Sequence, residues 1–184
     1  MNRRNFLQGA GRSLLAASLP IVPGAASWAK VLPDLPENAA GLSRRQWETL
    51  AALQDHLLPS EPEAPGAREV HATAYLYYTL TAPGTKPADQ AFIREGLERL
   101  DRVLRELGAQ PFTKLDEADR ESALRRLEQD KDGQHWIAEV LNFLLESLLA
   151  DPLYGGNPDT IGWRWLAHTP GFPRPPKGKE WYRI

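Results

Sequence analysis

Residues 134–150 read QHWIAEVLNFLLESLLA, and this stretch decides the fold. A helix drawn through it carries apolar side chains on nearly every face, at Trp136, Ile137, Val140, Leu141, Phe143, Leu144, Leu145, Leu148 and Leu149. A helix that is apolar all round is usually buried, at the centre of a bundle or beneath a partner protein. The stretch therefore predicts a central helix around which the rest of the chain packs.

Four amphipathic stretches precede this helix. The first begins at Ser43, which forms a Ser-x-x-Gln capping box with Gln46. The last is separated from the central helix by the dipeptide Asp132-Gly133. No stretch alternates with period two, so the predicted fold is all-α, a bundle of about five helices over residues 42–150. The predicted helices span about 43–58, 67–80, 87–107, 116–131 and 134–150.

The composition excludes several classes of protein. The 184 residues contain no cysteine, which excludes disulfides, iron–sulfur ligation and covalent haem attachment through a C-x-x-C-H motif in this chain. Lys and Arg total 22 and Asp and Glu total 24, a balance that argues against nucleic acid as a partner. No apolar run reaches the length of about 18 residues expected of a transmembrane helix.

The first 29 residues have the layout of an export signal. A basic start without acidic residues is followed by a short apolar stretch and by small residues. This layout predicts cleavage after Ala29, with Ala26 as the alternative, and a linker over 30–41. Paired arginines followed by x-Phe-Leu resemble the twin-arginine signal, which exports folded proteins to the periplasm. The residues of this signal are Arg3, Arg4, Phe6 and Leu7.

Residues 151–184, which we call the strap, differ in composition from the helices. Six prolines and five glycines between Pro152 and Gly178 predict an irregular segment that belongs to the same domain. Aromatic side chains on such a segment either anchor a partner or cover the chain's own core, and both alternatives are open at this stage. The candidate partner-binding residues are Tyr154, Gly155, Gly156, Asn157, Trp163, Trp165 and Phe172.

The sequence shows no convincing catalytic or metal site. The four histidines form no zinc motif, and the serine-hydrolase, dinucleotide and phosphate-loop motifs are absent. One pattern imitates a calcium-binding EF-hand loop but has Glu in place of Asp at its first position, His135 at its eighth, and no second loop. An acidic turn between helices is the preferred interpretation, and a calcium-responsive module is the alternative. The residues of this pattern are Glu128, Asp130, Asp132, Gly133 and Glu139.

The strap also carries a family resemblance. The run Asp151-Pro-Leu-Tyr-Gly-Gly-Asn157, followed by Gly162-Trp163 and Pro170-Gly171, resembles the signature of gluconate 2-dehydrogenase subunit 3. The first helix and loop agree with this family at residues 53–59 and 65–67, so that the resemblance spans roughly residues 42–173. The segment Ala167-His168-Thr169 departs from it, because an apolar–aromatic pair is commoner there.

The resemblance implies a non-catalytic small subunit of a periplasmic complex associated with the inner membrane. In that family a flavoprotein large subunit holds FAD and oxidises a sugar or sugar acid, and a multihaem cytochrome c subunit often passes the electrons on. The small subunit would hold no cofactor, would bind the large subunit, and would carry it through the twin-arginine export machinery. An independent exported ligand-binding module remains the alternative.

Overall fold

The computed structural model describes residues 38–171. The predicted export signal, most of the linker, Phe172 and the rest of the strap lie outside these residues. The described part is all-α, as predicted, with an isolated bridge between Glu61 and Ala64 in place of any strand. Its six α-helices are α3 (Arg44–Leu57), α4 (Ala72–Thr81), α5 (Pro87–Glu106), α6 (Glu117–Leu127), α7 (Lys131–Leu149) and α8 (Ile161–Trp165).

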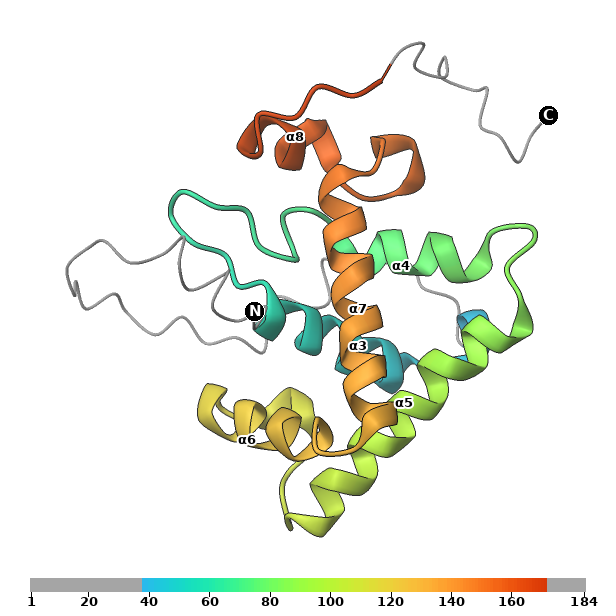
Figure 1. The fold of residues 1–184 in the computed structure, drawn as a ribbon, viewed down its shortest axis with the longest axis vertical. Coiled ribbons are helices and arrows are strands. Elements are labelled where there is room, and N and C mark those ends of the chain that lie inside the picture. The colour runs from blue at the N-terminus through green and yellow to red at the C-terminus, as the bar shows by residue number, and fades with distance from the viewer. Residues whose placement is uncertain (1–37, 172–184) are drawn as a thin grey trace.

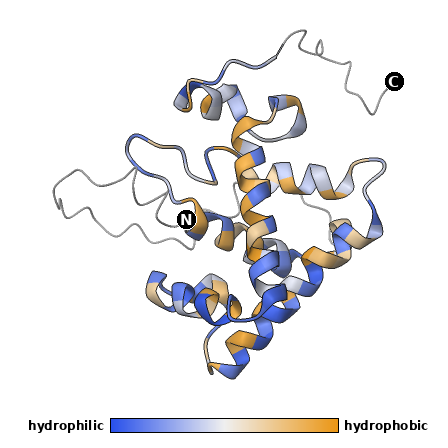
Figure 2. Ribbon diagram, viewed as in Figure 1, coloured by the Kyte–Doolittle hydropathy of each residue, from blue (hydrophilic) through white to orange (hydrophobic). Residues whose placement is uncertain are grey.

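The predicted central helix, α7, runs through the length of the molecule (Figure 1). It contacts α3, α4 and α5 along the bundle and α8 at its C-terminal end, while α6 packs on α5. Figure 2 shows the C-terminal half of α7 as the longest hydrophobic stretch of the ribbon. None of the helices within residues 38–171 combines the length and apolarity needed to cross a membrane.

The first helix begins as its sequence predicts. The Ser43 hydroxyl accepts a hydrogen bond from the Gln46 backbone N–H at 3.3 Å, and the Gln46 side chain accepts one from the Ser43 N–H at 2.9 Å. Leu42 and Trp47 on either side of the box are fully buried, as in a hydrophobic staple. The Trp47 indole N–H also donates to the Ala39 carbonyl, which joins the 3₁₀ turn Ala39–Gly41 to the core.

Three predicted helix boundaries are wrong. The helix predicted over about 116–131 ends at Leu127, as α6. Residues 67–71 form turns, because His71 has a left-handed backbone (φ 54°) that a continuous helix cannot contain, and α4 begins only at Ala72. The central helix begins at Lys131, so that Asp132 and Gly133 lie in its first turn and do not interrupt it. Gly133 is needed there because a Cβ at this position would lie 2.2 Å from the Leu127 carbonyl oxygen.

Where α5 crosses α7, a tryptophan ring lies directly against the backbone of the facing helix. The Trp136 ring of α7 is buried against Gly96 of α5, and a Cβ at Gly96 would lie 2.0 Å from Cδ1 of that ring. The indole therefore occupies the space that any side chain at Gly96 would need. Ile93, Leu97 and Leu100 extend the same buried face of α5.

We predict that Gly96→Ala destabilises the fold although alanine is the better helix former. Alanine gains about 1 kcal/mol in helix propensity. Displacing a fully buried indole costs more, so we expect a net loss of about 1–3 kcal/mol in the free energy of unfolding. Urea denaturation followed by circular dichroism measures this loss. Gly171→Ala is the matched control, since no atom lies within 4 Å of the added Cβ. A Gly96→Ala protein as stable as the parent would contradict the packing.

Candidate partner-binding site

Asn157 fastens the strap to the bundle. It is fully buried, and its side-chain amide donates to the Ala150 carbonyl at 2.9 Å while its side-chain oxygen accepts from the Gly162 N–H at 2.7 Å. Its backbone N–H donates to the Val70 carbonyl at 2.8 Å. One residue thus connects the end of α7, the start of α8 and the loop before α4. Its left-handed backbone (φ 51°) is a conformation that asparagine tolerates better than most residues.

The two glycines before Asn157 allow the strap to approach the helices closely. Gly155 has a left-handed backbone (φ 87°), and a Cβ there would lie 3.3 Å from the Ala74 carbonyl oxygen of α4. A Cβ at Gly156 would lie 3.1 Å from the Ser147 carbonyl oxygen of α7. Both positions therefore set the path of the strap between α4 and α7.

The described aromatic residues of the strap divide into buried and exposed side chains. Trp163 is 6 % exposed, and its indole N–H donates to the Leu149 carbonyl at 2.8 Å, so that it covers the end of α7. Tyr154 is half-buried, with its ring 5.4 Å from that of Tyr78 on α4. Trp165 is 43 % exposed. Only part of the predicted set is therefore available to a partner without unfolding.

Four exposed apolar side chains belong to the elements at this end of the molecule, and we call them the apical patch. They are Leu145 and Leu149 on α7, Trp165 on α8, and Leu166 directly after it. Of the large hydrophobic residues exposed within the described chain, only Leu107 lies elsewhere. Aromatic residues and the absence of charge are typical of the buried centre of a protein interface.

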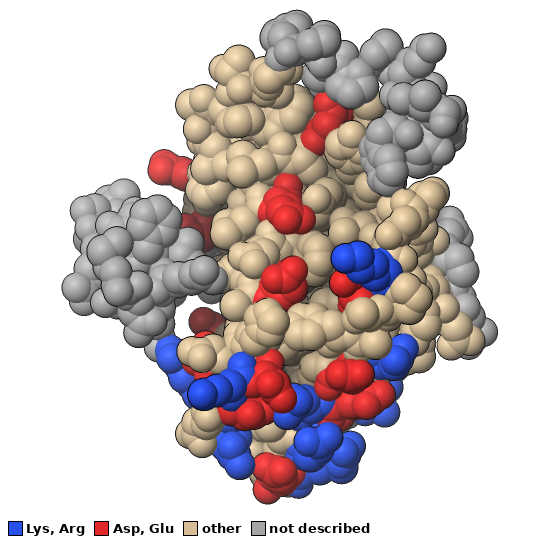
Figure 3. All heavy atoms as spheres, turned by 45° about the vertical axis from the view of Figure 1, so that its right-hand side comes forward, with Lys and Arg blue, Asp and Glu red and all other residues tan. Residues whose placement is uncertain are grey.

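Most Lys and Arg on the face drawn in Figure 3 lie at the other end of the molecule. They are mixed there with Asp and Glu, whereas the surface above carries mainly scattered acidic side chains. Arg125 binds Glu121 and Glu128 there, and Arg126 binds Glu106. These are exposed helix-surface pairs, each of which contributes little to stability.

The residues that imitate an EF-hand do not form a calcium loop. Residues 131–139, which a calcium loop would need in a largely non-helical conformation, belong to α7. The Arg99 guanidinium forms ion pairs with two of these carboxylates, at 2.7 Å from Asp130 and 2.9 Å from Asp132. Within residues 38–171 no group of three or more His, Asp or Glu side chains is placed to hold a metal ion.

Asp55, the most buried carboxylate with a shifted pKa, has a structural role. Burial raises the pKa of Asp55 on α3, while its ion pair with Arg68 opposes the shift. Burial lowers the pKa of Arg120, because it disfavours the charged guanidinium. The Arg120 side chain donates to the Phe112 carbonyl at 3.2 Å and lies over the Phe112 ring. The first contact joins α3 to the loop before α4, and the second joins α6 to the turn between α5 and α6.

Comparison with known proteins identifies a family. The family described as gluconate 2-dehydrogenase subunit 3 matches residues 44–171, more than half of the chain, in agreement with the resemblance noted in the sequence. The comparisons with curated proteins and with solved structures gave no significant match.

We predict that Asn157→Ala lowers the stability of the fold and weakens the attachment of the strap to the bundle. The change leaves the Ala150 carbonyl and the Gly162 N–H without their partner and puts alanine in a left-handed backbone, at an expected cost of about 2–4 kcal/mol. Thermal unfolding measures the loss, and hydrogen exchange at Gly162 locates it. The exposed Asn142→Ala on α7 is the control and should change stability by less than about 0.5 kcal/mol. Equal stability of the two variants would show that Asn157 is not the fastening point.

Proposed function

The chain belongs to the gluconate 2-dehydrogenase subunit 3 family, and we propose that it is the non-catalytic small subunit of a periplasmic FAD-dependent sugar or sugar-acid dehydrogenase. In this proposal it binds the flavoprotein large subunit and supports the folding and export of that subunit. The family description supports membership of a dehydrogenase complex, and the apical patch supports a contact with another chain.

The observation that carries the partner-binding proposal is the apical patch on a fixed support. Leu145 and Leu149 stand one turn apart on α7, and α8 is held against the end of that helix by Asn157 and by the Trp163 indole. A patch on a rigid support loses little conformational entropy on binding, which favours affinity. Large apolar side chains exposed on neighbouring elements are costly to leave in water and commonly mark interaction sites.

The redox cofactors would belong to other subunits in this proposal. FAD would reside in the large subunit and haem c in a cytochrome subunit where the complex has one. Without cysteine, this chain offers no thiolate for an iron–sulfur cluster and no C-x-x-C-H attachment for haem c. Its contribution would be to bind and stabilise the flavoprotein.

Export is the second part of the proposal. Arg3 and Arg4, with Phe6 and Leu7, would direct the small subunit to the twin-arginine machinery together with its folded partner. Because this route transports folded proteins, it suits a large subunit that must acquire its flavin before crossing the membrane.

We predict that Trp165→Ala combined with Leu166→Ala weakens binding of the large subunit but leaves the lone chain folded. Anchors at the centre of an interface contribute about 2 kcal/mol or more, which corresponds to roughly 30-fold in the dissociation constant. Biolayer interferometry with the purified large subunit measures affinity, and circular dichroism checks the fold.

Two further variants interpret that result. Leu107→Ala, an exposed apolar residue outside the patch, should leave binding unchanged. Trp163→Ala should instead cost the free subunit about 3–5 kcal/mol in stability, because its ring is buried in the chain itself. Normal affinity of the double variant would refute the apical patch as the contact.

We predict that Arg3→Lys combined with Arg4→Lys strands the large subunit in the cytoplasm. Both changes keep the positive charge but remove the guanidinium groups, which differ from ammonium groups in geometry and hydrogen bonding. Cell fractionation followed by a dehydrogenase assay locates the large subunit. Arg12→Lys is the control outside the pair. If the large subunit, lacking a signal of its own, still reaches the periplasm in normal amounts, the carrier role is wrong.

A further inference from the structure

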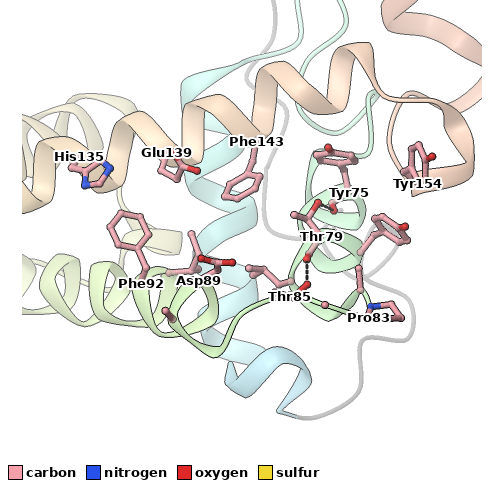
Figure 4. A pocket seen from close by; sticks show the side chains of 16 residues that line it. Tyr75, Thr79, Pro83, Thr85, Asp89, Phe92, His135, Glu139, Phe143 and Tyr154 are labelled. Atoms are coloured by element: carbon pink, nitrogen blue, oxygen red, sulfur yellow. Dashed lines mark hydrogen bonds between the residues drawn. The ribbon is translucent and has the colours of Figure 1, made fainter. Parts of the chain in front are cut away.

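A groove of about 1040 Å³ lies on the side of the bundle, away from the apical patch. Its walls are α4 and the turn after it, the first turns of α5, and the middle of α7, with Tyr154 of the strap at one end (Figure 4). The lining is rich in aromatic side chains. They are Tyr75, Tyr78, Phe92, His135, Phe143 and Tyr154.

The groove has charges of a single sign. Among residues 38–171, its lining contains the carboxylates of Asp89 and Glu139 and no Lys or Arg. In Figure 4, Glu139 and Phe143 project from α7 on the side that faces Asp89 and Phe92 of α5. At the far wall the Tyr75 hydroxyl donates a hydrogen bond to Glu146 at 3.1 Å. Burial of the phenol, and to a smaller extent the neighbouring Glu146 carboxylate, raises the pKa of Tyr75 to about 12. The phenol therefore stays neutral, and the negative charge of Glu146 remains beside the groove.

The rest of the described chain strengthens this field. Residues 38–171 contain 14 basic and 21 acidic side chains, and Figure 3 shows most of the Lys and Arg at the opposite end of the molecule. A cleft lined by one sign of charge attracts the other sign. Aromatic faces next to carboxylates favour a guanidinium in particular, because it is planar, stacks on rings and binds carboxylates with two hydrogen bonds.

The dimensions of the groove favour a length of polypeptide. Its volume is at the upper limit of small-molecule sites, which are about 300–1000 Å³ and bury most of their ligand. This groove is open to solvent along one side. Its position also connects it with the strap, because Tyr154 belongs to both, and Asn157 fastens the strap a few residues later.

We propose that the groove receives an extended segment of the flavoprotein partner that carries arginine between apolar or proline residues. The arginine lies between Asp89 and Glu139, and the flanking residues cover Phe92, Phe143 and the tyrosines. This inference rests on the proposed function, since it names the chemistry of the partner that the small subunit binds. The partner then holds the small subunit at the apical patch and, across the strap, in the groove.

Photo-crosslinking identifies the occupant, because a chain without cysteine can be labelled at one chosen position. The full chain with Ala88→Cys, labelled with a benzophenone, places the probe in the groove, and Ala118→Cys on α6 is the control position. With the purified large subunit, we expect the Ala88→Cys probe to capture a partner peptide that contains arginine. Capture of residues 172–184 of the same chain, whose Arg174, Lys177, Lys179 and Arg183 offer similar chemistry, would overturn the proposal. Capture of a second copy of the chain, or of nothing while the complex forms, would also overturn it.

Charge removal provides an independent measurement. Asp89→Asn with Glu139→Gln should weaken binding of the large subunit by at least about 10-fold and flatten its salt dependence. Glu95→Gln with Glu98→Gln removes the same charge from α5 outside the groove and should change affinity less than about 2-fold. Equal effects of the two pairs of substitutions would overturn the proposal that the groove binds the partner, while leaving the proposed partner role intact. A parent chain that binds no large subunit would refute the proposed function itself, and this inference with it.

Discussion

The contact of the Trp136 indole with the bare backbone at Gly96 sets the architecture. Because no side chain separates them, α5 and α7 cross closely, and their remaining apolar residues share one core with α3, α4 and α6. The interaction depends on a large ring on one helix and on no side chain on the other. Replacing either one would separate the two longest helices of the described chain and loosen every element packed on them.

The strap depends in turn on the end of α7. Asn157 binds the Ala150 carbonyl, and the Trp163 indole binds the Leu149 carbonyl, so the last carbonyl groups of the helix receive donors from the strap in place of water. The same fastening holds α8 beside Leu149 on one side and brings Tyr154 against Tyr78 on the other. The strap residues of the apical patch and Tyr154 at the end of the groove are thus held by one set of hydrogen bonds, which would suit the presentation of a preformed surface to the proposed partner.

The sequence predicted most of the helical fold because its signals are local. The capping box at Ser43 and the apolar run at 134–150 act within a few residues. The structure contains the box as predicted, and the run forms most of α7, which begins three residues earlier. The pairing of Gly96 with Trp136 could not be predicted, because the residues lie far apart in the chain and neither has a local signal for the other. The same limit applies to Trp163 and Trp165, which are two positions apart and equally apolar. Only the path of the strap decides which ring is buried. The apolar excess of α7 did contain a signal for the patch, since a helix touched by neighbours on some sides must expose Leu145 and Leu149 on the others.

The late position of α7 has a consequence for the chain as it is made. The contacts that α3, α4 and α5 make with α7 can form only after residues 131–149 have been synthesised. Between the end of α3 and the end of α7 the ribosome needs roughly 5–20 s at about 5–20 residues per second. During that interval the pair of α5 and α6 can associate, but the apolar faces of α3 and α4 have no central helix to cover them. The nascent chain is therefore most in need of a chaperone shortly before its central helix emerges.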